Sequence, residues 1–393
     1  MAESTAKAKS PSPEATTSAA AAGTSATGTA AAATTSPKSP KSPASPHSHS
    51  SGADVTGEAI GTEQTIQAAD NLDEDDDDGG SALGSDIQSS TGSLTESIYN
   101  YRVLHGRTFN APKTTEYWAP NDEQQNEGLD LLHNCLLMAL GDRLFLPPID
   151  DNPQKVLDVG TGTGIWAIDF ADMYPGAEVI GTDISPIQPV WTPPNVKFEI
   201  DDCLLEWTWP ENHFDFVHIR ALYGSIPDWG ELYGKAFKHL KPGCWLQDLE
   251  MDVRIQTDHV HIPDDHIFEE WSRAFIEAGD KNGRTFGISR DHMMRDTMIA
   301  AGFVDVQEVK LKVPCHGWPR DPKLQQAGLL LYAMLDQSIE GFCLYLFTKM
   351  LGWSVEEVLV FVARFRNEMK KKSNCGWILT TVAYGRKPEV GET

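Results

Sequence analysis

The stretch at residues 156–171 reads V-L-D-V-G-T-G-T-G-I-W-A-I-D-F-A and constrains the fold more than any other part of the chain. An apolar, β-branched run ends in three glycines, and apolar residues then return at helical spacing. The pattern predicts a strand over 155–159, a tight turn, and a helix that begins near Ile165. Glycines leave the backbone open to a ligand, and the amides that begin a helix donate hydrogen bonds. Such a combination is typical of a nucleotide-cofactor site.

The spacing of the glycines separates two classes of cofactor. Dinucleotide-binding turns need G-x-G-x-x-G, in which the third glycine lies three residues after the second. Here Gly160, Gly162 and Gly164 give G-x-G-x-G, and Ile165 stands at the position of that third glycine. The spacing therefore weakens the case for a nicotinamide or flavin cofactor.

Two acidic residues flank these glycines. Asp158, two residues before Gly160, would repel a pyrophosphate but would hold a ligand with an amino group, such as S-adenosylmethionine. Asp183 ends a second apolar run over 178–184, where a carboxylate commonly binds ribose hydroxyls. Both cofactor classes use an acid at the second position, so Asp158 is the more informative of the two.

Three further landmarks follow in order: N-V-K-F-E-I-D-D-C at 195–203, F-D-F-V-H-I-R at 214–220 and H-L-K-P-G-C-W at 239–245. With them the chain resembles the class I S-adenosylmethionine-dependent methyltransferases. The resemblance implies an α/β, Rossmann-like fold with a seven-stranded, mostly parallel sheet and helices on both faces. It also implies S-adenosylmethionine as the cofactor. In that family the third strand ends in an acid near the adenine, which here would be Asp202, beside Asp201.

Seven shorter pieces narrow the resemblance to the fungal LaeA-like methyltransferases. Members of that group are implicated in regulating secondary metabolism and development, often in the nucleus with velvet-type partners, while others modify small molecules. The resemblance therefore implies methyl transfer to an unidentified acceptor, which is a small molecule or a protein. The pieces read H-G-R at 105–107, A-P-N-D-E at 119–123, G-T-G-T-G-I-W-A-I-D-F-A at 160–171, D-I-S-P-I-Q-P at 183–189, P-P-N-V-K-F-E-I-D-D at 193–202, G-S-I-P-D-W at 224–229 and Y-G-R-K-P at 384–388.

The stretch before the first strand, 93–150, commonly folds over the cofactor in this family as a lid, followed here by a helix expected over 122–140. Aromatic and basic lid residues are therefore candidates to cover the methionine end, and Arg107 would pair with its carboxylate. The alternative is a surface segment docked by its aromatic rings. The lid candidates are Tyr99, Tyr101, His105 and Arg107. The predicted cofactor-binding residues are Tyr99, Arg107, Asp158, Gly160, Thr161, Gly162, Gly164, Asp183, Ile184, Asp202 and Cys203.

Residues after the fourth and fifth strands are candidates for the acceptor side, because strand ends of an open parallel sheet face the ligand crevice. His218, Arg220 and Tyr223 are the catalytic candidates, and Asp248 and Glu250 are placed similarly. Methyl transfer is an in-line displacement, so the protein mainly aligns the reactants and excludes water. An oxygen or protonated-nitrogen acceptor also needs a base, and His218 has a pKa ordinarily near neutrality. The alternative is that His218 is a structural residue of an apolar strand.

One cluster suggests a metal, but its spacing matches no standard site and indicates a loop that opens a helix. We therefore predict no metal site. The six cysteines show no C-x-x-C spacing, so neither a zinc site nor a disulfide framework is expected, and reduced thiols fit the cytosol or nucleus. The cluster consists of His259, His261, Asp264, Asp265 and His266.

Residues 1–92 contain no Phe, Trp or Tyr, so they cannot bury enough apolar surface to offset the entropy of ordering. We predict a disordered tail whose Ser-Pro pairs are either phosphorylation sites or part of a passive linker. The chain has 57 acidic and 32 basic residues, a formal charge of −25, which opposes direct binding to nucleic acid or an anionic membrane. No signal-peptide pattern begins the chain, so we expect a nuclear or cytoplasmic protein that is not secreted.

The predicted cofactor-binding core spans 151–313, and its last strand lies within 375–393. Between them, 314–374 is strongly helical in pattern and exceeds what the fold requires, so we predict a helical insertion on the acceptor side. Its most apolar stretch, 329–350, is interrupted by charged residues and is not expected to span a membrane. Packing against the core is the favoured way to bury this apolar surface.

Three functions agree with these features. The first is a regulatory methyltransferase that works in a nuclear complex. The second is a biosynthetic enzyme that methylates a small apolar natural product or carboxylic acid. The third is a non-catalytic scaffold that keeps the cofactor pocket for stability or signalling. An NAD-dependent reductase is a remote fourth, opposed by the glycine spacing.

Overall fold

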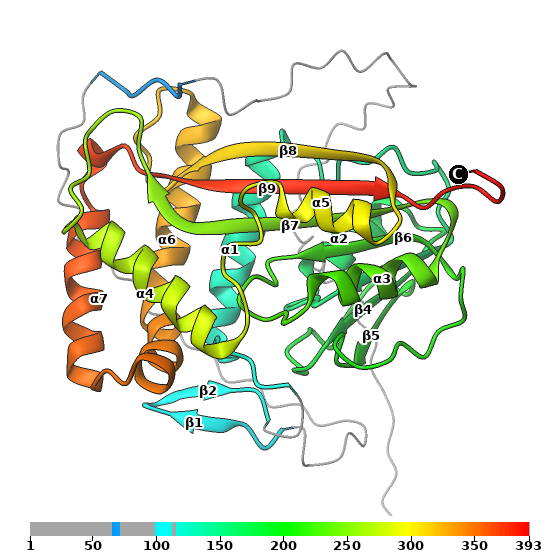
Figure 1. The fold of residues 1–393 in the computed structure, drawn as a ribbon, viewed down its shortest axis with the longest axis horizontal. Coiled ribbons are helices and arrows are strands. Elements are labelled where there is room, and N and C mark those ends of the chain that lie inside the picture. The colour runs from blue at the N-terminus through cyan, green and yellow to red at the C-terminus, as the bar shows by residue number, and fades with distance from the viewer. Residues whose placement is uncertain (1–64, 71–98, 112–114, 393) are drawn as a thin grey trace, which may run out of the picture. The chain divides into compact units, whose positions relative to one another are not determined.

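A seven-stranded sheet in the order β5-β4-β3-β6-β7-β9-β8 forms the centre of the fold (Figure 1). The computed structural model describes residues 65–70, 99–111 and 115–392. Strand β9 is antiparallel to both neighbours, while β3 to β7 are mutually parallel, which confirms the predicted Rossmann-like α/β class. The strands are β3 (Lys155–Val159), β4 (Glu178–Asp183), β5 (Val196–Ile200), β6 (Phe214–Arg220), β7 (Leu240–Gln256), β8 (Val304–Pro314) and β9 (Trp377–Arg386).

Successive residues of the central strand β3 point to opposite faces of the sheet, and each face is covered by helices. Val156 packs with Trp166 of α2 (Ile165–Met173), which lies behind the sheet in Figure 1. Leu157 faces the other way, into a cluster that includes Leu232 of α3 (Trp229–His239) and Met294 of α5 (Met293–Ala300). Because both faces of β3 are buried, the strand is apolar after Lys155 except at Asp158.

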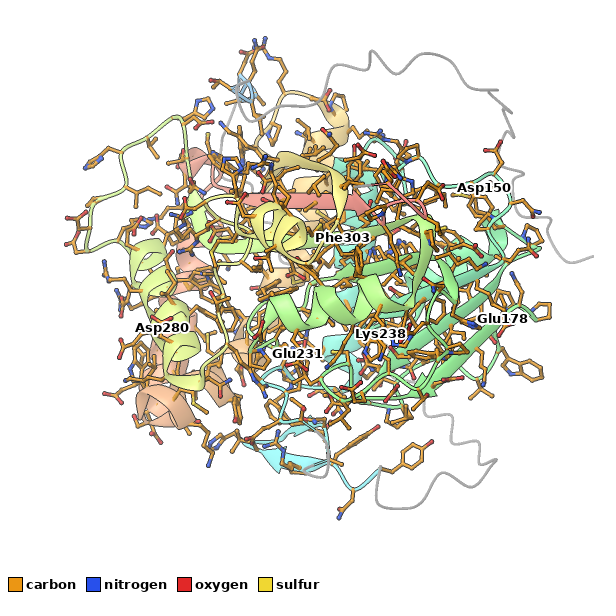
Figure 2. The ribbon with its side chains drawn as sticks, turned by 45° about the vertical axis from the view of Figure 1, so that its right-hand side comes forward. Asp150, Glu178, Glu231, Lys238, Asp280 and Phe303 are labelled. Atoms are coloured by element: carbon orange, nitrogen blue, oxygen red, sulfur yellow. The ribbon has the colours of Figure 1, made fainter. Side chains whose placement is uncertain are left out.

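The outer side of α3 is polar, as its sequence pattern requires. Figure 2 shows Glu231 and Lys238 on this side of the helix. The two side chains are 61% and 49% exposed, while Tyr233 and Ala236 of the same helix are fully buried. The apolar stripe of α3 is therefore part of the core.

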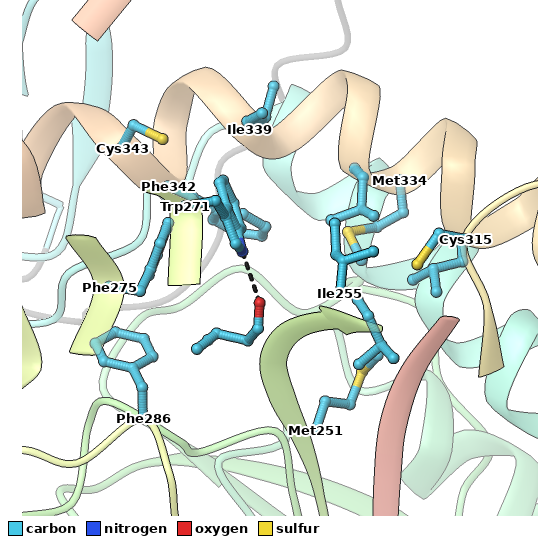
Figure 3. Close-up of a cluster of buried hydrophobic side chains, with 14 of the residues drawn as sticks. Met251, Ile255, Trp271, Phe275, Phe286, Cys315, Met334, Ile339, Phe342 and Cys343 are labelled. Atoms are coloured by element: carbon cyan, nitrogen blue, oxygen red, sulfur yellow. Dashed lines mark hydrogen bonds between the residues drawn. The ribbon is translucent and has the colours of Figure 1, made fainter. Parts of the chain in front are cut away.

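The predicted helical insertion forms α6 (Pro322–Tyr345), the π-helical turn η1 (Leu346–Leu351) and α7 (Val355–Met369). These elements pack with α1 (Glu123–Ala139) and α4 (Ile267–Asn282) against the sheet. Figure 3 shows Trp271 and Phe275 of α4 pointing toward Phe342 of α6, with the Trp271 indole donating to the Val253 carbonyl at 2.7 Å. A short 3-10 turn, η2 (Lys372–Asn374), leads into β9.

Within the described residues, one helical segment, Pro322–Leu351, is long and apolar enough to cross a membrane by length and composition alone. Of its most apolar window, 61% is buried inside the protein. Burial to this extent is what a core helix shows, so the segment gives weak support for a membrane span.

The lid region forms a two-stranded hairpin, β1 (Arg102–Leu104) and β2 (Arg107–Phe109), that precedes α1. Helix α1 begins where the sequence predicted, because the Asp122 carboxylate accepts from the Gln125 amide and caps the helix. The helix therefore lies within one residue of its predicted bounds at each end.

The predicted tail, 1–92, lies outside the described residues except for 65–70, where the structure differs from the prediction. Ala68 pairs with Pro319 in an antiparallel bridge, and the Ala69 amide donates to the Trp318 carbonyl at 3.0 Å. Ile66 packs near Trp318 and Trp377. The sequence did not predict this contact, because Ile66 is an isolated aliphatic residue in a polar stretch and its partners lie more than about 250 residues further along the chain.

Candidate active site

A cavity opens at the carboxyl ends of strands β3 to β6. The glycine turn forms its floor: Gly160 and Gly164 adopt φ of 69° and 83°, where a side chain is strained. A Cβ at Gly164 would lie 2.2 Å from the Phe198 ring, so close packing as well as backbone conformation requires glycine there. Gly164 supports the turn from below and does not itself line the cavity, whereas Gly160, Thr161 and Gly162 do.

Asp183, at the end of β4, lines the cavity as the sequence predicted. Its Oδ2 accepts from the Gly162 amide and its Oδ1 from the Ser185 amide, both at 2.9 Å. Burial, with a contribution from nearby Asp158, raises the pKa of Asp183 to about 6. Each carboxylate oxygen keeps a lone pair free for a ligand hydroxyl. Ile184 lines the cavity beside it.

Asp202 follows β5 and lies on the same wall, next to Asp201 and Cys203. Its Oδ2 accepts from the Thr115 amide at 3.1 Å and its Oδ1 from the Leu204 amide at 3.0 Å. The bond to Thr115 joins the strand end to the segment before α1. The two walls of the cavity are therefore fastened together at this point.

Asp158 and His218 lie beneath the glycine turn and outside the cavity, which differs from the roles predicted for them. The Asp158 carboxylate accepts from Thr161 Oγ1 at 2.6 Å and from His218 Nδ1 at 2.7 Å. The His218 ring stacks on Trp166 at 3.7 Å between centroids, and burial lowers its pKa. With its ring enclosed by these contacts, His218 holds the turn in place and is not positioned as a general base for an acceptor.

Arg220, at the end of β6, lines the cavity. Its Nη1 donates to His133 Nδ1 at 3.0 Å, and His133 Nε2 donates to the Asp169 carboxylate at 2.9 Å. Burial lowers the pKa of Arg220. Among the described residues no carboxylate lies in ion-pair contact with this guanidinium, so four of its five N–H groups are free for a ligand.

Arg107, predicted to bind the cofactor carboxylate, is placed elsewhere by the structure. Its Nε and Nη2 donate to the two oxygens of Asp122 at 2.5 and 2.7 Å, and it does not line the cavity. The sequence does not show that Asp122, which caps α1, also forms an ion pair with Arg107. Tyr99 is 52% exposed and also lies outside the cavity lining.

The segment 115–121 and the start of α1 supply a cavity wall. The sequence assigned this stretch to the predicted lid and helix but named none of these residues as a site candidate. Tyr117 lines the cavity, and burial raises its pKa, with smaller contributions from Asp183, Tyr223 and Glu250. Asn121 and Gln125 also line it and are 6% and 1% exposed. Both amide atoms of Asn121 and the Oε1 of Gln125 lack a hydrogen-bond partner among the described residues. The A-P-N-D-E piece was the available signal, since it places Asn121 in a family-like pattern.

The other acceptor-side candidates lie behind the cavity wall. Tyr223 packs on Trp118 and Phe286 and faces a separate apolar pocket. Glu250 is buried, and its two oxygens accept from the Leu222 and Tyr223 amides at 2.8 and 2.9 Å.

Asp248 accepts from the Tyr233 hydroxyl at 2.6 Å, and burial raises its pKa to about 7. Glu250 therefore supports the loop after β6 and Asp248 holds α3, and neither acid lines the cavity. No residue of the helical insertion lines it either, in contrast to the predicted acceptor-side placement.

The histidine and aspartate cluster of the 259–266 loop is dispersed among structural roles. His259 Nε2 contacts the Ile66 carbonyl at 2.9 Å, and His266 caps α4 and pairs with Glu368 at 3.2 Å. Across the described ranges, no three His, Cys, Asp or Glu side chains gather in a way that could hold a metal ion.

Comparison with known proteins defines the class. The family described as Methyltransferase domain matches residues 132–307. Methyltransferase pytC of Aspergillus terreus is 38% identical over 72% of this chain and 87% of its own length. The secondary metabolism regulators LAE1 of Cochliobolus heterostrophus and laeA of Monascus pilosus are 34% and 30% identical, over 65% and 78% of this chain and 84% and 82% of theirs.

The chain is a class I S-adenosylmethionine-dependent methyltransferase. Within that class it belongs to the LaeA-like family, as the sequence resemblance indicated. The residues of the cavity fit the cofactor: the glycine floor leaves room for a ligand against the backbone, and the Asp183 carboxylate in the lining can accept hydrogen bonds from hydroxyl groups. Arg220 and Asn121 present unused hydrogen-bonding groups at the other end.

Proposed function

We propose that this chain transfers a methyl group from S-adenosylmethionine to an acceptor in the control of fungal secondary metabolism and development. The relatives named as secondary metabolism regulators support the biological role. The observation that carries the chemistry is a cavity with paired carboxylates at one end and an arginine free of carboxylate partners at the other. A nucleoside offers hydroxyl donors to the carboxylates, and the carboxylate of an attached amino-acid group offers an anion to the arginine.

Residue roles follow from the position of each group in the cavity. Asp183 would bind the ribose hydroxyls and Asp202 would contact the adenine, as predicted from the strand ends. Arg220 would pair with the methionine carboxylate in place of Arg107, because Arg220 lines the cavity and its guanidinium has no carboxylate in ion-pair contact among the described residues. Asn121 would complete the shell at this end, since its amide nitrogen and oxygen are both unpaired.

The chain's contribution to the reaction is alignment and exclusion of water. When bound, the cofactor supplies a methyl group on a positively charged sulfur that departs as a neutral thioether. Tyr117 and Leu222 enclose the space between the glycine turn and the loop after β6, so they would hold the acceptor in line with the methyl carbon. Asp158 and His218 keep the turn rigid from below.

Partners and location extend the proposal. A chain with formal charge −25 needs a partner to act at chromatin, and velvet-type regulatory proteins are the partners that the family resemblance implies. We place the protein in the nucleus or the cytoplasm. Co-purification of a velvet-type protein with the full-length chain from fungal nuclei supports this, and recovery only as a free cytoplasmic chain opposes it.

A biosynthetic role is the second candidate, favoured by the 38% identity to Methyltransferase pytC. Secondary-metabolite profiles of a deletion strain separate the two roles. Loss of several unrelated products indicates a regulator, whereas accumulation of one unmethylated precursor indicates a biosynthetic enzyme.

Calorimetric titration of the full-length protein with S-adenosylmethionine, S-adenosylhomocysteine and NAD tests the cofactor site. We expect the first two to bind with one site per chain and NAD to give no heat. Binding of NAD alone contradicts the proposed function. The Asp183→Ala strain addresses the scaffold alternative, which predicts that the biological effect survives the loss of cofactor binding.

A further inference from the structure

The described part of the cavity wall around Tyr117 and Leu222, where the acceptor would lie, contains no free general base. Of the described residues that line the cavity, none is a histidine or a lysine. The carboxylates of Asp183 and Asp202 each accept two backbone amides, and Asp201 Oδ1 accepts the Asp202 amide, all at the ends of β4 and β5 where the nucleoside would lie. Glu116 lies at the rim in an ion pair with Arg102. His218 and Glu250, which have suitable chemistry, are held behind the wall by their own hydrogen bonds.

Arg284 provides a cation on this same wall. It follows α4, and the neighbouring Thr285 carbonyl accepts from the Gly224 amide at 2.8 Å, which ties the segment to the loop after β6. Its Nη1 donates to the Glu116 carbonyl at 2.6 Å, beside Tyr117, and the residue lines the cavity. One of five N–H groups is used in this contact, so the fork of a guanidinium remains available to a planar anion.

We propose that the methyl acceptor is a carboxylate on an apolar body, held by Arg284 next to Tyr117, and that the product is a methyl ester. This inference rests on the proposed function. A carboxylate is already ionised at neutral pH, because its ordinary pKa is about 4. It therefore needs no general base, which agrees with a wall that supplies a cation and apolar surface from Leu222 and Ile226.

The bonds and charges of this step balance without a co-reactant. A carboxylate oxygen lone pair forms the new O–C bond to the methyl carbon, and the C–S pair leaves with sulfur. One negative and one positive charge disappear together, and no proton is released. Transfer to an alcohol or to a protonated amine releases one proton, for which the described wall around Tyr117 and Arg284 offers only Glu116, already paired with Arg102.

Three probes of matched shape test the proposal: cinnamate, cinnamyl alcohol and cinnamylamine. Each is titrated into the full-length protein saturated with S-adenosylhomocysteine. We expect cinnamate to bind at least about tenfold more tightly than the other two, and Arg284→Gln to weaken cinnamate by about tenfold, because hydrogen bonds between charged groups are lost. Arg295→Gln, which changes an exposed arginine on α5 beside Asp296, is the matched control and leaves cinnamate binding unchanged.

The outcomes separate this inference from the proposed function. If S-adenosylhomocysteine itself fails to bind, the proposed function is wrong. If it binds but cinnamate does not, or the alcohol or amine binds as tightly, the carboxylate assignment is overturned. Cinnamate binding that is unchanged by Arg284→Gln, in a variant that still binds S-adenosylhomocysteine, also overturns it.

Discussion

The two ends of the cavity differ in how their polar groups are paired. At the end formed by β4 and β5, Asp183 and Asp202 already hold backbone amides with both oxygens. At the other end, Arg220 has one hydrogen bond, to His133, and the side-chain amide of Asn121 has none among the described residues. At the first end the chain itself supplies hydrogen-bond partners for the carboxylates. At the second end buried polar groups lack partners, and a ligand would supply them.

The difference has an energetic meaning. A polar group that is paired in the folded chain contributes to stability, so its removal leaves partners unpaired and costs free energy of folding. A buried polar group without a partner lowers the stability of the ligand-free protein, and a ligand that pairs with it removes that destabilisation. Substitutions at the two ends should therefore change stability in opposite directions while both weaken cofactor binding.

The largest expected effect is at the paired end. In Asp183→Ala, the Gly162 and Ser185 amides lose their acceptor, and the ribose loses its partner. We expect S-adenosylmethionine affinity to fall by about 100-fold and the free energy of unfolding to fall by about 1 kcal/mol or more. Calorimetry and urea unfolding measure the two quantities. Asp172→Ala, on the exposed side of α2, is the control, and an unchanged affinity in Asp183→Ala removes this end from the cofactor site.

At the unpaired end, Arg220→Met removes a buried charge and keeps most of the volume. We expect cofactor affinity to fall by about tenfold, with no loss of stability in the ligand-free protein. Arg143→Met, at an exposed position after α1, should change neither quantity. A large loss of stability in Arg220→Met would show that Arg220 serves the fold through His133 and not the ligand.

A smaller effect is expected at Asn121, on the same wall. Asn121→Leu replaces two unpaired amide atoms by methyl groups of similar size. Cofactor affinity should fall about fivefold, the equivalent of one neutral hydrogen bond, while the urea midpoint stays equal or rises. A lower midpoint with undiminished affinity contradicts the assignment.

The smallest effect on affinity is expected behind the wall, at Asp248. Burial raises its pKa from 3.8 to about 7, so the unfolded chain loses this proton at lower pH than the folded chain does. Its contribution to stability is therefore complete below pH 3.8 and is lost as the pH rises toward 7 and above. Asp248→Asn should flatten this decline, which one proton limits to about 1.4 kcal/mol per pH unit, and should change cofactor affinity less than twofold. Urea unfolding at several pH values measures how the free energy of unfolding changes with pH. If Asp248→Asn leaves this pH dependence unaltered, another group causes it.

The paired end was the predictable one, for a physical reason. Glycines and strand-end acids act through their own backbone and their immediate neighbours, so the glycine turn and Asp183 could be inferred from local patterns. The fold and the role of Asp202 came from the family resemblance. The cavity wall at Tyr117 and Asn121 depends on how α1 packs over the glycine turn, which no local pattern encodes. Arg107 is a second example of a placement that local patterns do not predict. Asp122 caps α1 and also forms an ion pair with Arg107.

The role of His218 also depends on contacts with other elements, which the sequence of its own strand does not show. Its position before the end of β6 was predicted, but the direction of its side chain depends on Trp166 and Asp158, which come from two other elements. The register places Asp158 beside His218 on neighbouring strands, so the pair could be recognised only once β3 and β6 were known to be adjacent. Pairing of this kind turns a candidate base into a support for the turn.

The most direct test of the account combines the two changes at the unpaired end. Urea unfolding of the Arg220→Met/Asn121→Leu protein is measured with and without saturating S-adenosylhomocysteine, beside the unsubstituted chain. We expect the ligand-free double variant to be at least as stable as the parent and the ligand to stabilise it far less. A double variant that is less stable without ligand, yet is stabilised by the ligand as much as the parent, would contradict the claim that the cofactor completes this end of the cavity.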